Sequence, residues 1–125
     1  MIYDILFGIY MLNAILLIMH ELDSVYWKEW DLFRLKGGLH FFLVLHVPFL
    51  FLILYGLVLV REQKTAGLVI SAVLSICGLF AFFIHNYFIH KGRPEFNTVF
   101  SKGLLWFIGI VSPAQLVLTV RGFVP

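Results

Sequence analysis

The sequence LHFFLVLHVPFLFLILYGLVLV, residues 39–60, contains no Asp, Glu, Lys or Arg. It is followed by the short polar link REQKT (61–65) and then by a second uncharged run over residues 66–90. A helix needs about 20 apolar residues to cross the hydrocarbon core of a bilayer, and both runs have that length. Because the link between them is short, the two runs are predicted to form antiparallel, neighbouring helices.

Two further apolar runs, residues 2–20 and 104–120, flank this hairpin and are also long enough to cross a bilayer. The composition agrees, because 62% of the residues are apolar and only 13% are charged, against about 25% charged in soluble domains. The sequence therefore predicts an all-α protein: a membrane-embedded, antiparallel up-down four-helix bundle that forms one domain over residues 1–125. The polar, aromatic-rich segment 21–37 is expected to lie at the membrane interface, between the first two helices.

The basic residues are divided unequally between the two sides of the predicted bundle. Segments 21–37 and 91–103 share one side and contain Lys28, Arg34, Lys36, Lys91, Arg93 and Lys102, whereas the opposite side contains Arg61, Lys64 and Arg121. Cytoplasmic loops carry the excess of Lys and Arg. We therefore expect these two segments in the cytoplasm, both termini outside, and a bacterial inner membrane as the location. The net charge of +2 is too small to indicate nucleic acid as a partner.

Small residues and prolines indicate how the helices pack. Ser71, Ser75 and Gly78 recur at spacings of four and three, so this small-residue stripe is expected to face the interior of the bundle. Pro48 and Pro113 lie inside the second and fourth predicted helices, and each is expected to kink its helix.

All five histidines are predicted to lie on the same side of the membrane. In four alternating helices, the end of the first, the start of the second and the end of the third share one side, and these regions contain His20, His40, His46, His85 and His90. At 1.5 Å per residue, His46 lies about 12 Å inside the start of its helix and His85 about 9 Å inside the end of its helix. These two side chains are therefore expected at similar depth. His85 also continues the small-residue stripe, so it is expected to point inward.

The inner histidines and a nearby carboxylate form the predicted metal site. His20, His46 and His85 supply three imidazoles, and Asp23 or Glu21 supplies the carboxylate, with Asp23 as the ligand assigned here. Such a set is usual for zinc or iron, and a catalytic site keeps an open position for water. A bound metal lowers the pKa of that water. If Asp23 binds the metal, Glu21 is free to act as the general base.

Four other polar side chains near this site receive different interpretations. Asn13 and Asn86 are expected to orient the metal ligands or the substrate through hydrogen bonds, as cofactor-binding residues that do not touch the metal. His40 and His90 are interpreted as interfacial side chains that hydrogen-bond a carbonyl or a lipid headgroup.

The segment WKEW, residues 27–30, is interpreted as a membrane anchor. Trp27 and Trp30 have the amphipathic rings that favour the headgroup layer. Glu29 between them is expected to be a solvated loop charge.

The sequence His20-Glu21-Leu22-Asp23-Ser24 resembles the motif of the HXXEE family of small integral membrane proteins. Together with YWKEW at residues 26–30, it is also similar to bacterial four-span relatives of that family. The match is partial, because Asp23 stands at the first motif glutamate and Ser24 at the second. The resemblance implies that His20 and Asp23 are site residues, and it implies no activity. A fainter similarity, through three histidines and a carboxylate at one membrane face, is to the seven-span ceramidase-like membrane hydrolases.

Three classes of function fit these features. The first is a metal-dependent membrane hydrolase, with zinc or iron as cofactor and a lipid or other lipophilic substrate that enters from the bilayer. The second is a b-type haem protein, in which two of the three inner histidines are axial ligands. The third is a non-enzymatic role as a transporter, an assembly factor or an accessory subunit, with a homo-oligomer as the arrangement that transport requires. The sequence leaves these three alternatives open.

Overall fold

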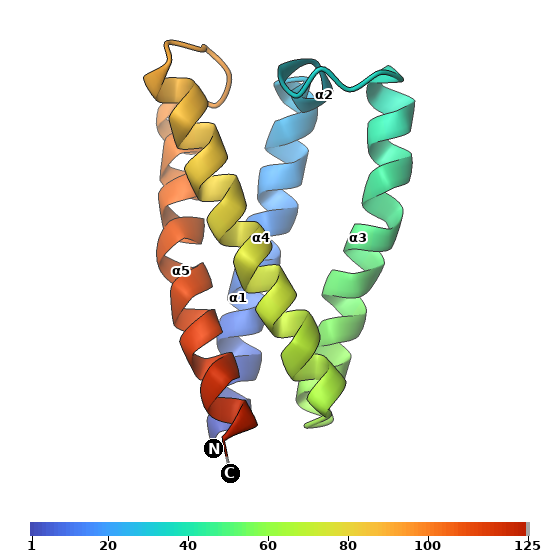
Figure 1. Cartoon of the computed structure of the whole chain (residues 1–125), viewed down its shortest axis with the longest axis vertical. Coiled ribbons are helices and arrows are strands. Elements are labelled where there is room, and N and C mark those ends of the chain that lie inside the picture. Colours follow the sequence, from blue (N-terminus) through green and yellow to red (C-terminus); the bar gives the residue numbers. More distant parts are fainter. Residues whose placement is uncertain (125) are drawn as a thin grey trace.

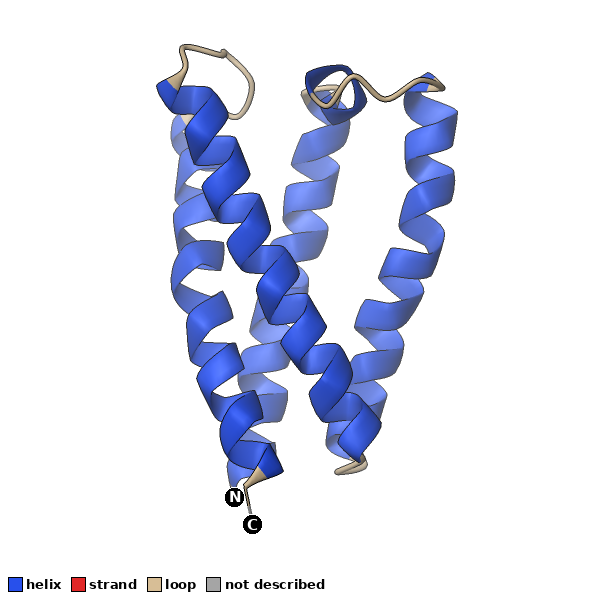
Figure 2. Ribbon diagram, in the orientation of Figure 1, coloured by secondary structure: helices blue, strands red, loops and turns tan. Residues whose placement is uncertain are grey.

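The computed structural model describes residues 1–124 as five helices, α1 (Ile2–Tyr26), α2 (Glu29–Leu32), α3 (Gly38–Arg61), α4 (Thr65–His90) and α5 (Val99–Phe123). The four long helices are each long and apolar enough to cross a membrane, and no strand occurs within residues 1–124. They run up and down as a bundle, with both chain ends at the same end of the molecule (Figure 1, Figure 2). The predicted all-α, membrane-embedded four-helix bundle is therefore confirmed.

Each predicted span lies inside a helix, and two of the helices extend well beyond their spans. α1 continues past His20 to Tyr26, so the first carboxylates of the polar segment are helical. α5 begins one residue after Thr98, whose side chain accepts a hydrogen bond from the helix backbone and so caps it. α3 and α5 continue as helices on both sides of Pro48 and Pro113.

Two consecutive glycines turn the chain into α3. Gly37 has φ +115° and Gly38 has φ +63°, a region that is open to glycine and unfavourable for residues with a Cβ. A Cβ at Gly37 would also lie only 2.5 Å from the Cβ of Phe41. The pair therefore allows α3 to start close to the end of α2.

The helices do not pack uniformly along their length. α5 packs against α1 and α4, whereas α3 packs against α4 and α1 and makes no contact with α5 among residues 1–124. α3 and α4 lie close together near the link that joins them and diverge toward the opposite end, where α2 lies between α1 and α3 (Figure 1). This divergence positions the site described below.

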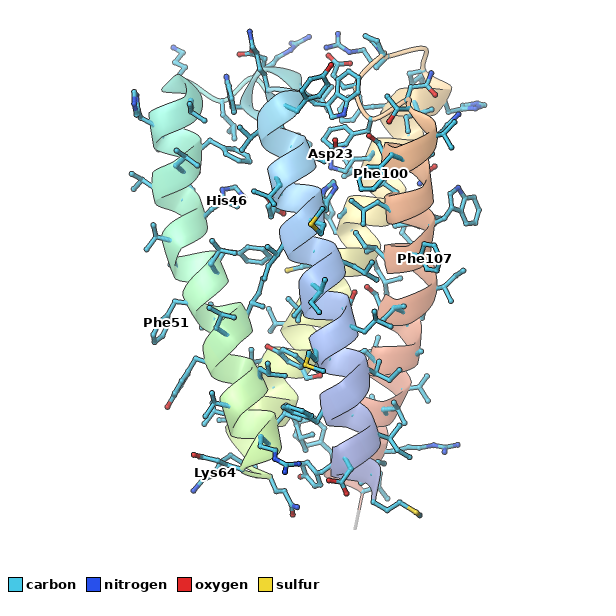
Figure 3. The ribbon with its side chains drawn as sticks, turned by 180° about the vertical axis from the view of Figure 1, so that it is seen from behind. Asp23, His46, Phe51, Lys64, Phe100 and Phe107 are labelled. Carbon is cyan, nitrogen blue, oxygen red and sulfur yellow. The ribbon has the colours of Figure 1, made fainter. Side chains whose placement is uncertain are left out.

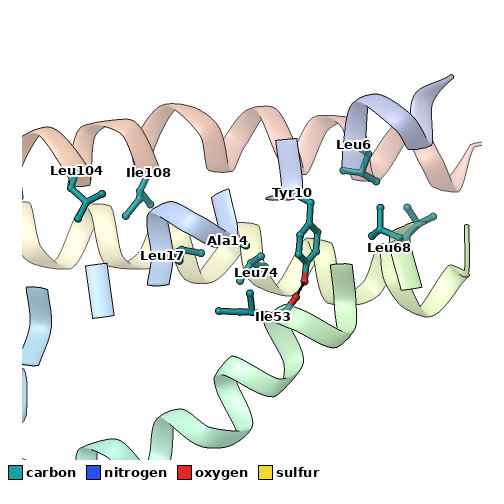
Figure 4. Close-up of a cluster of buried hydrophobic side chains, with 10 residues drawn as sticks. Leu6, Tyr10, Ala14, Leu17, Ile53, Leu68, Leu74, Leu104 and Ile108 are labelled. Atoms are coloured by element: carbon teal, nitrogen blue, oxygen red, sulfur yellow. Dashed lines mark hydrogen bonds between the residues drawn. The ribbon is translucent and has the colours of Figure 1, made fainter. Parts of the chain in front are cut away.

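A continuous apolar core holds α1, α3, α4 and α5 together. Its almost fully buried members include Leu6 and Tyr10 of α1, Ile53 of α3, Leu68 of α4 and Ile108 of α5 (Figure 4). The Tyr10 hydroxyl donates a hydrogen bond of 2.8 Å to the Ile53 carbonyl oxygen, which fastens α1 to α3. Away from this bond the core is held by close packing of side chains.

A buried hydrogen-bond network joins α1, α4 and α5 inside the bundle. Gln115 is its centre: its Oε1 accepts a bond of 2.7 Å from Asn13 Nδ2, and its Nε2 donates to Ser71 Oγ over 2.9 Å. Ser71 also pairs with Thr119 over 2.7 Å, and all four side chains are fully buried. The small-residue stripe of α4 faces the bundle, as predicted. The close approach of α4 to α5 requires Gly78, because a Cβ there would collide with the Oγ of Ser112.

Candidate metal centre

Three ionisable side chains from three different helices converge at the α2 end of the bundle. His20 near the end of α1, Glu29 at the start of α2 and His85 near the end of α4 each offer one ligand atom, and these atoms lie within 4.8 Å of one another. All three residues are buried, with 2%, 9% and 1% of their surfaces exposed. We call this group the His–Glu–His cluster.

Within the cluster, His85 contacts Glu29, and two histidine nitrogens have no hydrogen-bond partner in the described part of the chain. Nε2 of His85 lies 2.9 Å from Oε1 of Glu29, within hydrogen-bond distance. Nδ1 of His20 and Nδ1 of His85 are buried and have no hydrogen-bond partner within residues 1–124. A buried polar atom without a partner costs about 1–3 kcal/mol, so these nitrogens are expected to have a ligand.

Glu29 is held in its charged form although it is buried. Burial raises the pKa of its carboxyl group, but the hydrogen bond from His85 and the charges of His85 and His20 outweigh that effect, and the pKa lies below its ordinary value. A deprotonated carboxylate is the form that binds a metal ion.

Two loops close over the cluster in strained backbone conformations. The Phe96 ring, which is buried, packs on both histidines, with centroids 4.1 Å from His85 and 5.3 Å from His20. Phe96 has φ +61° and Lys28, directly before α2, has φ +52°, although neither is glycine. Such conformations cost about 1–3 kcal/mol each and persist where the surrounding structure enforces them, often at functional sites.

A second pair, Glu21 and His46, lies on the α3 side of α1. Oε2 of Glu21 is 2.6 Å from Nε2 of His46, and Nδ1 of His46 is 2.7 Å from the Phe42 carbonyl oxygen. A carbonyl oxygen only accepts, so Nδ1 carries a proton and donates it to Phe42. At 2.6 Å, Nε2 and the carboxylate share one further proton, either as an imidazolium with a carboxylate or as a neutral imidazole with a carboxylic acid.

One cavity of about 260 Å³ connects the two groups. His20, Glu29 and His85 line it, and so do Glu21 and His46; its other lining residues are apolar or aromatic side chains and Cys77. His46 lies on the side of α3 that faces α1 (Figure 3). A possible ligand set and a proton-carrying pair therefore line the same partly open cavity.

The structure brings together only part of the predicted site. His20 and His85 meet, and His85 points inward as predicted, whereas His46 pairs with Glu21 outside the His–Glu–His cluster. Asp23 is not a member of the cluster, and its Oδ2 has no partner among residues 1–124; it lies on the side of α1 away from α3 (Figure 3). Asn13 belongs to the Gln115 network instead.

The remaining predicted residues lie away from the cluster. Asn86 Nδ2 donates to the Phe82 carbonyl oxygen of its own helix over 2.7 Å. His40 and His90 are exposed. These three residues contribute no atom to the His–Glu–His cluster.

The interpretation of Glu29 as a solvated loop charge is wrong. Glu29 is a buried partner of His85, and Trp30 is buried against Phe42 with ring centroids 5.4 Å apart. The available signal was the crowding of carboxylates and aromatic rings over residues 21–30, which is costly beside a membrane span unless the charges are compensated.

Comparison with known proteins gives a family and no activity. A search of curated proteins and a search of solved structures each returned no match. One family model matches a range of the chain within which His20, Glu29 and His85 lie, and the resemblance to the HXXEE family is not confirmed. The chain belongs to the protein family described as "Family of unknown function (DUF6713)", which it matches over residues 6–122.

Proposed function

We propose that this protein is a metal-dependent membrane hydrolase in which His20, Glu29 and His85 hold the ion. The observation that carries the proposal is that this buried cluster and the Glu21–His46 pair line one cavity. Two imidazoles and one carboxylate are a ligand set of catalytic zinc sites, which keep a fourth position for water or substrate. The same set also serves non-haem iron, so zinc and iron both remain proposed cofactors.

The dimensions of the cluster support a single small ion. Zinc lies about 2.0–2.2 Å from nitrogen and oxygen ligands, so two ligands of one ion are at most about 4.4 Å apart. The three ligand atoms lie within 4.8 Å of one another, and small side-chain rotations suffice to close the difference. A neutral imidazole has one nitrogen with a free lone pair, so His20 and His85 can each supply one lone pair to such an ion.

The short distance between the two histidines supports an ion over a haem. The rings of His20 and His85 contact each other edge to face, with centroids 4.8 Å apart. Two axial ligands of a haem lie on opposite faces of the porphyrin, and this contact leaves no space for a macrocycle between the rings. Both nitrogens of His46 are already engaged, by Phe42 and Glu21.

The Glu21–His46 pair supplies the proton transfers that hydrolysis of an ester or amide requires. A bound ion supplies Lewis acidity and lowers the pKa of water at the site. The pair accepts a proton from water as the water oxygen forms a bond to the carbonyl carbon. It returns that proton to the leaving oxygen or nitrogen as the bond from the carbonyl carbon to that atom breaks. One water is consumed, one acid and one alcohol or amine are released, and the pair regains its starting state.

We further propose that the site faces the cytoplasm of a bacterial cell. Lys28, Arg34 and Arg93 lie in the loops at the α2 end of the bundle, and the excess of basic residues over the opposite end favours this side.

Hydrolysis of p-nitrophenyl palmitate in detergent micelles tests the function. The purified protein, loaded with zinc or ferrous iron, is expected to release nitrophenolate. The Glu21→Gln variant is expected to lower kcat by about 10²–10⁴-fold, the usual effect of losing a general acid or base. It should keep its metal, because Glu21 is not in the cluster. Metal-loaded, folded protein that hydrolyses neither this ester nor the matching anilide would contradict the proposal.

A further inference from the structure

A second cavity lies directly next to the first, deeper in the bundle. It has a volume of about 250 Å³ and lies between residues 49–53 of α3 and residues 70–77 of α4. Its lining is apolar apart from the thiol of Cys77, and it contains no charged residue. Phe49 and Cys77 line both cavities, so the two cavities adjoin each other between α3 and α4, and we call them together the groove.

The groove is open toward the surrounding membrane along its side. Its floor includes Ile53 and Leu74, which are almost fully buried, whereas Leu52 and Val73 on its two rims are about half exposed at 46% and 51%. The groove is lined by residues of α3 and α4, and these two helices separate toward the α2 end (Figure 1). A lipid chain can therefore enter it sideways from the bilayer, without passing through either loop region.

We propose that this groove holds one acyl chain of a membrane lipid, with the ester or amide linkage of that chain beside the His–Glu–His cluster. The inference names the substrate class of the proposed hydrolase and rests on that function. The groove has a polar end and an apolar end, as a lipid has a polar linkage and an apolar chain. The carboxylates and imidazoles lie only in the first cavity, at the α2 end, and the second cavity is apolar apart from the Cys77 thiol. An amphiphile therefore binds in one direction only, because the reverse direction buries its polar group without partners.

The length of the groove suits a long chain. From His85 to Ile70 along α4 the groove extends over roughly 22 Å at 1.5 Å per residue. Half of the hydrocarbon core of a bilayer is about 15 Å thick. A full-length acyl chain can therefore lie in the groove in an extended conformation.

Photo-crosslinking with a defined lipid tests the proposal. The full chain is reconstituted in phosphatidylcholine vesicles doped with a phosphatidylcholine that carries a diazirine near the end of one acyl chain. It is then extracted and exchanged thoroughly into detergent before irradiation, so that loosely held lipid is removed. Mass spectrometry is expected to find the label on residues 49–53 and 70–77, and not on the exposed face of α5 around Trp106 and Ile110.

Variants that fill the groove provide the control. Val73→Trp and, from the opposite rim, Leu52→Trp are each expected to lower labelling about tenfold, because displacing two methylene groups from an apolar site weakens binding by about that factor. Ile110→Trp, on the exposed face of α5, should leave labelling unchanged. Label spread evenly over all outer faces, no retained label, or crosslinks between two copies of the chain at the groove would overturn the proposal.

Metal content, measured on the same samples, separates the two proposals. Labelling of the groove in protein that never binds zinc or iron would support the lipid groove and reject the metal centre. Full metal content together with unspecific labelling would reject the lipid groove and leave the metal centre supported.

Discussion

Oε1 of Glu29 lies 2.9 Å from Nε2 of His85, although all of α3 and most of α4 separate the two residues in sequence. The contact joins the short α2 to the end of α4 and completes the group that also contains His20. Through this contact, α2 contributes a carboxylate to the candidate metal centre.

Replacing the carboxylate of this contact should abolish tight metal binding. Glu29→Gln keeps the shape of the side chain and removes its charge. We expect zinc affinity to fall by more than about a hundredfold, since loss of even an outer partner of a metal ligand weakens binding by about 10–100-fold. Competition against a colorimetric chelator measures the change. Glu95→Gln is the matched control, because Glu95 pairs with Arg93 in the loop outside the cluster. Equal affinity in the two variants would remove Glu29 from the ligand set.

The metal-free protein should lose stability at acid pH through Glu29. Because the pKa of Glu29 is lower in the folded protein than in the unfolded chain, its contribution is fully present above the ordinary glutamate pKa of about 4.3. That contribution is lost as the pH falls through the folded pKa. Thermal unfolding in detergent with a chelator, from pH 7 down to pH 3, should show a steeper decrease in Tm for the wild type than for Glu29→Gln. If Tm falls equally with pH in the wild type and in Glu29→Gln, the lowered pKa of Glu29 is contradicted.

The Gln115 network should stabilise the bundle without affecting the metal. Gln115→Leu removes its side-chain bonds to Asn13 and Ser71 and leaves their buried polar atoms without that partner. Side-chain hydrogen bonds inside membranes contribute about 0.6 kcal/mol each, and up to about 1.7, so a loss of roughly 1–3 kcal/mol is expected. Tm should fall while metal content stays that of the wild type. Asn86→Leu, which removes only a bond to its own helix, is expected to have a smaller effect. A larger decrease in Tm for Asn86→Leu than for Gln115→Leu would argue against the network as a stabilising element.

Close packing of α4 on α5 should make Gly78 intolerant of even one methyl group. Gly78→Ala forces a Cβ against the Oγ of Ser112, and overpacking of this kind costs about 1–3 kcal/mol. Gly103→Ala is the control, because a Cβ at Gly103 has no neighbour within 4 Å and alanine favours the helix by up to about 1 kcal/mol. Denaturant unfolding monitored by circular dichroism should show a lower free energy of unfolding for Gly78→Ala than for the wild type, and a higher one for Gly103→Ala. A neutral Gly78→Ala would mean that the two helices separate easily.

The sequence predicts the bundle well because apolar runs of span length have few alternatives in a membrane. The meeting of His20 and His85 follows from the same reasoning, since alternating helices bring the end of the first and the end of the third to one side. The place of Glu29 does not follow, because it depends on Lys28 at φ +52°, which turns the chain back over the bundle. Helical periodicity contains no information about such a turn.

His46 shows a second limit of the sequence. Its expected depth is similar to that of His85, and depth alone suggested that the two side chains meet. In the structure α3 diverges from α4 at this end of the bundle, so His46 pairs with Glu21 of α1. Divergence of two helices results from packing along their whole length, which a pattern of apolar residues does not specify.

The metal content of three purified proteins tests the central claim most directly. Elemental analysis of the wild type, His85→Ala and His90→Ala compares a buried member of the cluster with an exposed histidine of the same helix. We expect one zinc or iron ion per chain in the wild type and in His90→Ala, and none in His85→Ala. A folded wild type without metal, or His85→Ala with its metal content unchanged, would contradict the claim.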